Sequence, residues 1–306
     1  MPSPERTIAV STPAAALTEH SPSETIARSL IEDSSALVSP PDVCLKINDL
    51  VADERTVIED LAGVVIRDPN LTSKVLKLAN SSYYGLATRV DTVSRAVMLL
   101  GMRELQKIVC TIAAVQTFSR LSSAVTNMNA FWRHSVYVGL MAQAIARRAR
   151  ILHPERLFVA GVMHDIGTLV INQRFPELAE AMIRDAAGSE DELYRIEQAR
   201  LGFDHTYLAG LMLQNWNLPV ALCEAVRWHH LPHRARLAGL EAAILKVSDT
   251  IANYSGTGSS SEIIAREDAH DVSLLARFGV DLNCTNDELM DEVDQQFVET
   301  IYLLVG

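Results

Sequence analysis

Histidine and aspartate are the side chains of this sequence best suited to chemistry. His164 and Asp165 are adjacent in the segment F-V-A-G-V-M-H-D-I-G, where an apolar helix is expected to end before Gly167. Where the chain bends at such a point, an imidazole nitrogen and a neighbouring carboxylate oxygen can reach one metal ion. The dipeptide alone is a weak indication, because such pairs also occur by chance.

Further histidines and one further aspartate stand at comparable places, at the ends of apolar helices or on their inward faces. They are His134, His205, His229, His230 and Asp249. Each has a simpler explanation, since a core histidine is more often hydrogen-bonded than metal-bound, and capping, a surface turn or a buried ion pair would serve for the others. Five of the nine histidines and two acids in such positions favour a shared site.

The elements that must position these residues are predicted to be helices. Apolar residues recur at helical spacing, and no run alternates apolar and polar residues as a half-buried strand would, so the fold class is all-α. Asp68 before Pro69 predicts a helix start, and Thr56 with Glu59 predicts a capping box for the preceding helix. The three tryptophans fall on apolar helix faces and are predicted to be core residues: Trp132, Trp216 and Trp228.

Composition restricts the classes of function. The chain has 306 residues, of which 48% are hydrophobic and 21% charged, and 27 basic against 38 acidic residues give a formal net charge of -11. This balance argues against broad binding to nucleic acid or to an anionic membrane. Four scattered cysteines predict a reducing compartment, and neither a spanning apolar run nor a secretory signal is apparent, so a cytoplasmic location is expected.

The spacing of these ligand candidates resembles a known family. The order H, H-D, H, H-H, D across a helical domain is similar to the HD superfamily of metal-dependent phosphohydrolases, and most similar to its HDOD branch of bacterial signalling proteins. The resemblance covers about 39–254. Its most specific segments are S-P-P-D-V-C-L-K-I, I-R-D-P-N-L-T-S-K-V-L-K-L-A-N-S-S-Y-Y-G and V-S-R-A-V-M-L-L-G-M-R-E-L.

Composition, apolar spacing and the resemblance together imply a division of the chain. Residues 1–35 are expected to be a disordered or weakly helical leader, and 36–255 an HDOD domain. That domain would comprise an amino helical bundle over 39–125 and an HD-like bundle over 126–255. A Gly- and Ser-rich linker and an acidic helical tail would follow over 256–306.

The resemblance also implies a metal centre. The basic ligand set of the superfamily falls on His134, His164, Asp165 and Asp249. His205, His229 and His230 match the additional histidines of the HD-GYP cyclic-dinucleotide phosphodiesterases. Such centres activate water for attack on phosphorus, and ligands of this kind suit Fe, Mn, Zn or Ni, as a mononuclear or binuclear site.

Three departures from the active family pattern weigh against catalysis. Thr168 replaces the lysine that commonly follows H-D-x-G, and no Gly-Tyr-Pro element follows His229 and His230. Ala130 stands where a glutamate one turn before the first histidine could supply a further ligand.

Two hypotheses of different classes follow. The preferred one is a bacterial signal-transduction module whose pocket binds a metal, a nucleotide or a cyclic dinucleotide and which acts through partner proteins. The alternative is an active metal-dependent phosphohydrolase in which Asp165 orients the attacking water. The missing lysine and Gly-Tyr-Pro favour the first, and the nearly complete ligand set favours the second.

Overall fold

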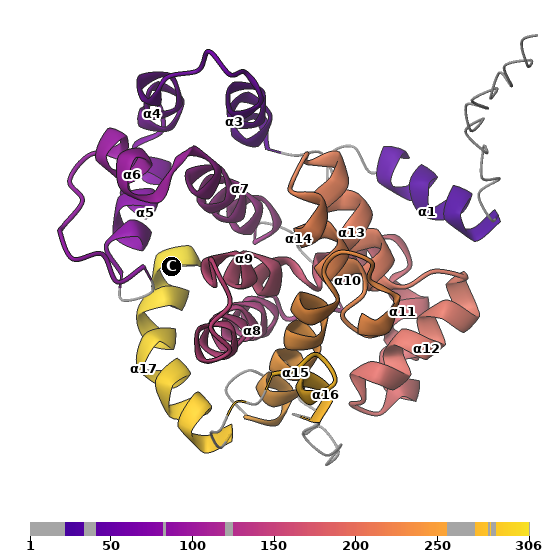
Figure 1. Cartoon of the computed structure of the whole chain (residues 1–306). Helices are drawn as coiled ribbons and strands as arrows, with labels where there is room; N and C mark the ends of the chain where they lie inside the picture. The colour runs from indigo at the N-terminus through magenta and orange to yellow at the C-terminus, as the bar shows by residue number, and fades with distance from the viewer. Residues whose placement is uncertain are drawn as a thin grey trace, which may run out of the picture.

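The computed structural model describes residues 22–33, 41–81, 84–119, 125–255, 273–280, 282 and 286–305, and throughout these ranges the regular elements are helices (Figure 1). This confirms the predicted all-α helical bundle. No helix among these residues combines the length and hydropathy that crossing a membrane requires. Most of the predicted leader and the Gly- and Ser-rich linker lie outside the described residues.

The helices follow one another with short connections through most of the chain. The amino half contains α1 (Pro22–Asp33), α3 (Asp42–Ala52), α4 (Ile58–Ile66), α5 (Pro69–Ala79), α6 (Val93–Leu100) and α7 (Met102–Phe118). The carboxyl half contains α8 (Met128–Arg148), α9 (Glu155–Met163), α10 (Ile166–Arg174), α11 (Pro176–Ala186), α12 (Glu190–Leu201), α13 (His205–Asn215), α14 (Val220–Arg227), the 3-10 turn η1 (Pro232–Arg234), α15 (Gly239–Tyr254), α16 (Ser273–Ala276) and α17 (Asn286–Leu304).

Capping residues set two of the helix starts in the amino half. Asp68 caps α5 as predicted, because its carboxylate accepts hydrogen bonds from the N–H groups of Asn70 and Leu71, with Pro69 in the first turn. The predicted capping box of α4 is wrong by one residue. That helix begins at Ile58, and the carboxylate of Asp60 accepts the hydrogen bond from the Val57 N–H at 3.0 Å.

The two halves share one continuous core. Helix α7 packs on α3, α5 and α6 within the amino half and on α9 of the carboxyl half. Its apolar residues are buried on nearly every side, as expected for a helix enclosed by others.

Glycines allow the helices that carry the histidines to approach closely. A Cβ atom at Gly161 of α9 would lie 2.5 Å from the Cα atom of Gly139 in α8. A Cβ atom at Gly167 of α10 would lie 2.0 Å from the carbonyl oxygen of His205 in α13. The glycine of H-D-I-G is therefore required for α10 to lie against the start of α13.

The acidic terminal helix α17 packs across both halves (Figure 1, yellow). Leu289, Val293, Phe297 and Leu304 face inward and are buried against α8 and α5. Two polar contacts supplement this packing, from Arg148 to Glu292 at 3.0 Å and from the Lys74 ammonium to the Leu304 carbonyl oxygen at 2.9 Å. The acidic residues of this helix thus form the outer face of a packed element.

Candidate metal centre

Four helices bring the first four candidate ligands together. His134 lies on the inner face of α8, Asp249 on that of α15, and His164 and Asp165 at the bend between α9 and α10. The Nε2 atom of His134 is 3.1 Å from Oδ1 of Asp249, and the Nε2 atom of His164 is 3.2 Å from Oδ2 of Asp165. All four side chains are buried, with His134 and His164 fully enclosed.

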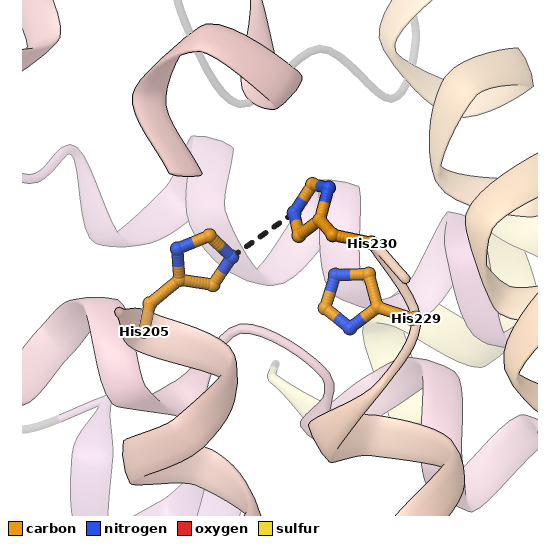
Figure 2. A group of neighbouring side chains, drawn as sticks. All are labelled: His205, His229 and His230. Atoms are coloured by element: carbon orange, nitrogen blue, oxygen red, sulfur yellow. Dashed lines mark hydrogen bonds between the residues drawn. The ribbon is translucent and has the colours of Figure 1, made fainter. Parts of the chain in front are cut away.

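The other three histidines form a second group beside them. His205 begins α13, and His229 and His230 follow the end of α14. Their rings face one another, as Figure 2 shows, and the Nε2 atoms of His205 and His230 are 3.3 Å apart. One nitrogen from each ring lies within 4.8 Å of the others, a spacing that a metal ion could span.

Asp165 joins the two groups. Its Oδ2 atom lies 3.2 Å from the Nε2 atom of His164 and 3.9 Å from that of His134. Its Oδ1 atom lies 3.5 Å from the Nε2 atom of His205 and 4.0 Å from that of His229. The seven candidate residues therefore form one cluster, with one carboxylate between a four-residue side and a three-histidine side.

Backbone carbonyls orient two of the histidine rings. The Nδ1 atom of His164 lies 2.7 Å from the Gly161 oxygen, and that of His229 lies 2.8 Å from the Val226 oxygen. A carbonyl only accepts, so each Nδ1 donates the hydrogen bond and each Nε2 retains its lone pair. This lone pair is the one that a metal would use.

Carboxylates orient two more rings. The Nδ1 atom of His205 lies 2.6 Å from Oε2 of Glu197, and that of His230 lies 3.0 Å from Oδ1 of Asp191. Both acids belong to α12, outside the predicted ligand set. Carboxylate partners of this kind fix the ring and raise its basicity in metal sites.

The inner atoms of the cluster fit a metal. The Nε2 atoms of His164 and His229 and the Oδ1 atom of Asp165 are buried and make no hydrogen bond to any described residue. Such atoms cost about 1–3 kcal/mol each when left without a partner. Imidazole and carboxylate together are the donors that divalent transition metals use, so the donor chemistry and the orphaned atoms agree.

The electrostatics of the cluster are those of a tightly paired buried site. Burial lowers the pKa of His134, but the hydrogen bond and the charge of Asp249 outweigh burial and raise this pKa to about 9. Burial raises the pKa of Asp165, but His164, His205 and His229 hold it well below its usual value. Burial and the neighbouring His230 and His164 together lower the pKa of His229, which favours its neutral, ligating form.

A small cavity of about 60 Å³ adjoins the cluster and contains groups that sequence reasoning missed. Glu190, Asp191 and Lys246 line it together with His230 and Asp249. Burial and the nearby carboxylates of Asp249 and Asp165 raise the pKa of Glu190 to about 7. Lys246 contacts Asp191 at 2.7 Å and so places a positive charge at the cavity wall.

Comparison with known proteins assigns the family. The model of the HDOD domain matches residues 37–232, about two thirds of the chain. The chain belongs to the HDOD domain family. The family match includes six of the seven clustered residues, and Asp249 enters the cluster from α15 beyond the matched range.

The chain is also similar to solved structures and to curated sequences. A provisionally named phosphohydrolase of Shewanella amazonensis SB2B is 25% identical, with a TM-score of 0.68 over 90% of this chain and 97% of that one. A provisionally named signal-transduction protein of Marinobacter aquaeolei VT8 is 22% identical, with a TM-score of 0.64 over 91% of this chain and 65% of the other.

An uncharacterized protein of Treponema pallidum (strain Nichols) is 23% identical over 211 residues, which are 68% of this chain and 40% of that protein. The HDOD chain thus spans about 40% of the length of the curated relatives it matches.

Proposed function

We propose that this protein is a bacterial HDOD signalling module whose buried histidine and aspartate cluster holds one or two divalent transition metal ions and which acts through a partner protein. The observation that carries the proposal is the convergence of seven buried side chains, among which the Nε2 atoms of His164 and His229 and the Oδ1 atom of Asp165 make no hydrogen bond to the described residues. The signalling role draws on the HDOD assignment and on the name of the Marinobacter neighbour.

The ligands would divide between the two sides of the cluster. His134, His164, Asp165 and Asp249 would hold one ion, and His205, His229 and His230 would hold another, with the Asp165 carboxylate available to both. Fe, Mn, Zn and Ni all accept such ligands.

The Asp165→Ala variant tests this proposal, with Asp49→Ala on the exposed face of α3 as the matched control. The purified parent protein and the Asp49→Ala variant are expected to contain near-stoichiometric transition metal by elemental analysis, and Asp165→Ala to lose it. The melting temperature of Asp165→Ala should fall as well, because a ligand that binds only the folded state stabilises that state. Equal metal content in all three proteins, or no metal even after reconstitution with Mn, Fe or Zn, would reject the centre.

A phosphohydrolase activity is the second candidate function, and Lys246 favours it. Thr168 leaves the site without the usual lysine, but Lys246 presents an ammonium group to the same cavity from α15. A bound metal would act as a Lewis acid toward water and phosphate oxygens. Lys246 would neutralise charge on the phosphate, Asp165 would orient the attacking water, and burial would exclude bulk solvent.

The cavity restricts the substrate of such an activity. A volume of about 60 Å³ accommodates a few water molecules or one phosphate group, and a cyclic dinucleotide would require the cavity to widen. Turnover of a simple phosphomonoester by metal-loaded protein that is lost in Lys246→Met, while the metal content stays unchanged, would establish this second function. Its absence with a full complement of metal would leave the signalling role.

A further inference from the structure

A second cavity, of about 210 Å³, lies against the backbone that carries the histidine cluster. We call it the arginine–tryptophan cavity, and its principal lining residues are Tyr194, Asp204, Tyr207, Arg227, Trp228 and Arg234. Asp204 directly precedes His205, and Trp228 directly precedes His229. None of the candidate metal ligands lines this cavity, but two of its lining residues are direct neighbours of such ligands in the chain.

The two arginines form no ion pair with a carboxylate of the described residues. The guanidinium carbon of Arg227 lies 4.4 Å from the ring centre of Tyr207 and 5.0 Å from that of Trp228. Its Nε atom is buried and makes no hydrogen bond to the described part of the chain. Arg234 is exposed, and its guanidinium carbon lies 5.9 Å from the ring centre of Trp228. Because a buried N–H group without an acceptor is costly, this arrangement indicates an anion as the missing partner.

The carboxylate of Asp204 in the cavity wall is not the missing anionic partner of the two arginines. It accepts hydrogen bonds from the Tyr207 N–H at 2.8 Å, the Thr206 hydroxyl at 2.6 Å and the Gln198 amide. These bonds hold the carboxylate at the start of α13 as the helix cap. Two cationic groups therefore remain for a ligand, in a chain whose net charge is -11.

The aromatic side chains of this cavity favour a planar ligand. Trp132 and Trp216 are buried in the core as predicted. Trp228 was predicted to be a core residue as well, but it is only half-buried and lines the cavity. Tyr194 and Tyr207 provide two further rings. Stacking of a base on an aromatic side chain contributes about 1–3 kcal/mol, and arginine is well suited to phosphate.

We propose that the arginine–tryptophan cavity binds a phosphate monoester carrying a planar ring, the chemical class to which nucleoside monophosphates belong. Arg227 and Arg234 contact the phosphate, and the ring lies against Trp228. This site does not require a metal, so its occupancy can be measured in the metal-free protein.

Contacts behind the cavity would transmit its occupancy to the histidine cluster. The ring of Tyr194 is stacked on that of His230, with centres 4.9 Å apart. The Thr206 hydroxyl, next to His205, shares its proton between the Asp204 carboxylate at 2.6 Å and the Arg227 carbonyl oxygen at 2.8 Å. A ligand that moves Tyr194 or Arg227 would therefore displace His205 or His230, and linkage requires any effect on metal affinity to be reciprocal.

The test is a calorimetric titration of the full chain, freed of metal with a chelator, with AMP and GMP. One molecule is expected to bind per chain, with a change in the fluorescence of Trp228, since the other two tryptophans are enclosed. Arg234→Gln should weaken binding at least tenfold. Arg236→Gln is the matched control, because Arg236 is an exposed arginine of the same loop outside the cavity.

Three results would overturn the proposal. These are no binding by the parent protein, equal affinity of Arg234→Gln and Arg236→Gln, and binding that needs added metal or disappears in Asp165→Ala. If inorganic phosphate bound as tightly as the nucleotides, the planar ring would not contribute to binding, and that part of the proposal would be rejected. Repeating the titration on Mn²⁺-loaded protein freed of excess ion tests the coupling, and an unchanged nucleotide affinity would refute it.

Discussion

The orientation of four of the five clustered imidazoles is decided by a single oxygen atom on the side of the ring remote from the cluster. Gly161 and Val226 supply backbone oxygens, and Glu197 and Asp191 supply carboxylates. Since each of these oxygens fixes which ring nitrogen faces inward, the ligating atoms are pre-positioned. The Nε2 atoms of His164 and His229 make no hydrogen bond to the described residues, so a metal that bound them would stabilise the fold.

Glu197→Gln should weaken metal binding by about 10- to 100-fold, because His205 loses the carboxylate that holds its ring and raises its basicity. Competition with a chromophoric chelator measures this affinity. Glu192→Gln on the exposed surface of α12 is the control and should bind metal like the parent. Equal affinities for both variants would mean that Glu197 only caps the N–H of His205, to which it also accepts a hydrogen bond at 2.9 Å.

The metal-free protein should lose stability as the pH rises from about 6.5 to 9. Protonated His134 is stabilised by Asp249, and its pKa rises from 6.5 to about 9 despite burial. A group whose pKa is raised on folding stabilises the protein fully below its unfolded pKa and loses that contribution as the pH passes its folded pKa. The shift corresponds to about 3 kcal/mol. Glu190, whose pKa is raised from 4.5 to about 7, loses its contribution at lower pH, between about 4.5 and 7.

Urea denaturation of metal-free protein at several pH values measures this loss of stability, and His134→Gln should reduce it. The free energy of unfolding of the metal-loaded protein should instead rise with pH, because ligands must lose protons to bind metal. A free energy of unfolding that rises between pH 6.5 and 9 in the metal-free protein would contradict the pairing of His134 with Asp249.

The sequence identified all seven clustered residues but none of their partners on α12. Histidines at the ends of apolar helices stand out because a polar group there needs a reason to be buried. Glu197 and Asp191 lie in the segment E-D-E-L-Y-R-I-E-Q-A-R-L, which has the pattern of a solvated helix. Only the packing of that helix over the cluster gives its acids a role, so no local pattern could have revealed them.

At the scale of elements, the helix ends were more difficult to predict than the helices. Apolar spacing is repeated over several turns, so each helix is indicated many times, whereas a cap depends on one side chain. The predicted cap at Asp68 is confirmed, because Pro69 fixes the position at which α5 begins. The α4 cap was misplaced because two adjacent acids, Glu59 and Asp60, could each have reached back, and the shorter one does.

Gly167→Ala should destabilise the protein by several kcal/mol, since its Cβ would lie 2.0 Å from the His205 carbonyl oxygen. Helix α10 would have to move away from α13, which would also separate Asp165 from His205. Gly63→Ala is the control, because nothing lies within 4 Å of a Cβ atom there. Because Gly63 is an exposed position of α4, that change should stabilise the protein by up to about 1 kcal/mol. Denaturant titrations measure the free energy of unfolding of both variants. Equal changes in this free energy would show that α10 and α13 tolerate a wider spacing.

At the scale of the whole molecule, the terminal helix links the amino half to the helix that carries His134. Helix α17 contacts α5, α7 and α8, so the chain after the linker region completes the core. The apolar residues of this helix recur at helical spacing, but the sequence does not show which surface they cover, because that surface comes from residues more than a hundred positions earlier. Partner binding by this helix would therefore have to use its outer acidic face.

Phe297→Ala should lower the free energy of unfolding by about 3–5 kcal/mol, the usual cost of removing a buried phenylalanine. Phe297 is 3% exposed, and its ring centre lies 5.5 Å from that of Tyr137 and 5.3 Å from the guanidinium carbon of Arg133, both on α8. Val298→Ala, at a position that is 72% exposed, should change stability by less than about 0.5 kcal/mol. Because Arg133 adjoins His134, Phe297→Ala should also weaken metal binding in a chelator competition. If the two variants were equally stable and bound metal equally, α17 would be an appendage and not part of the frame that holds the centre.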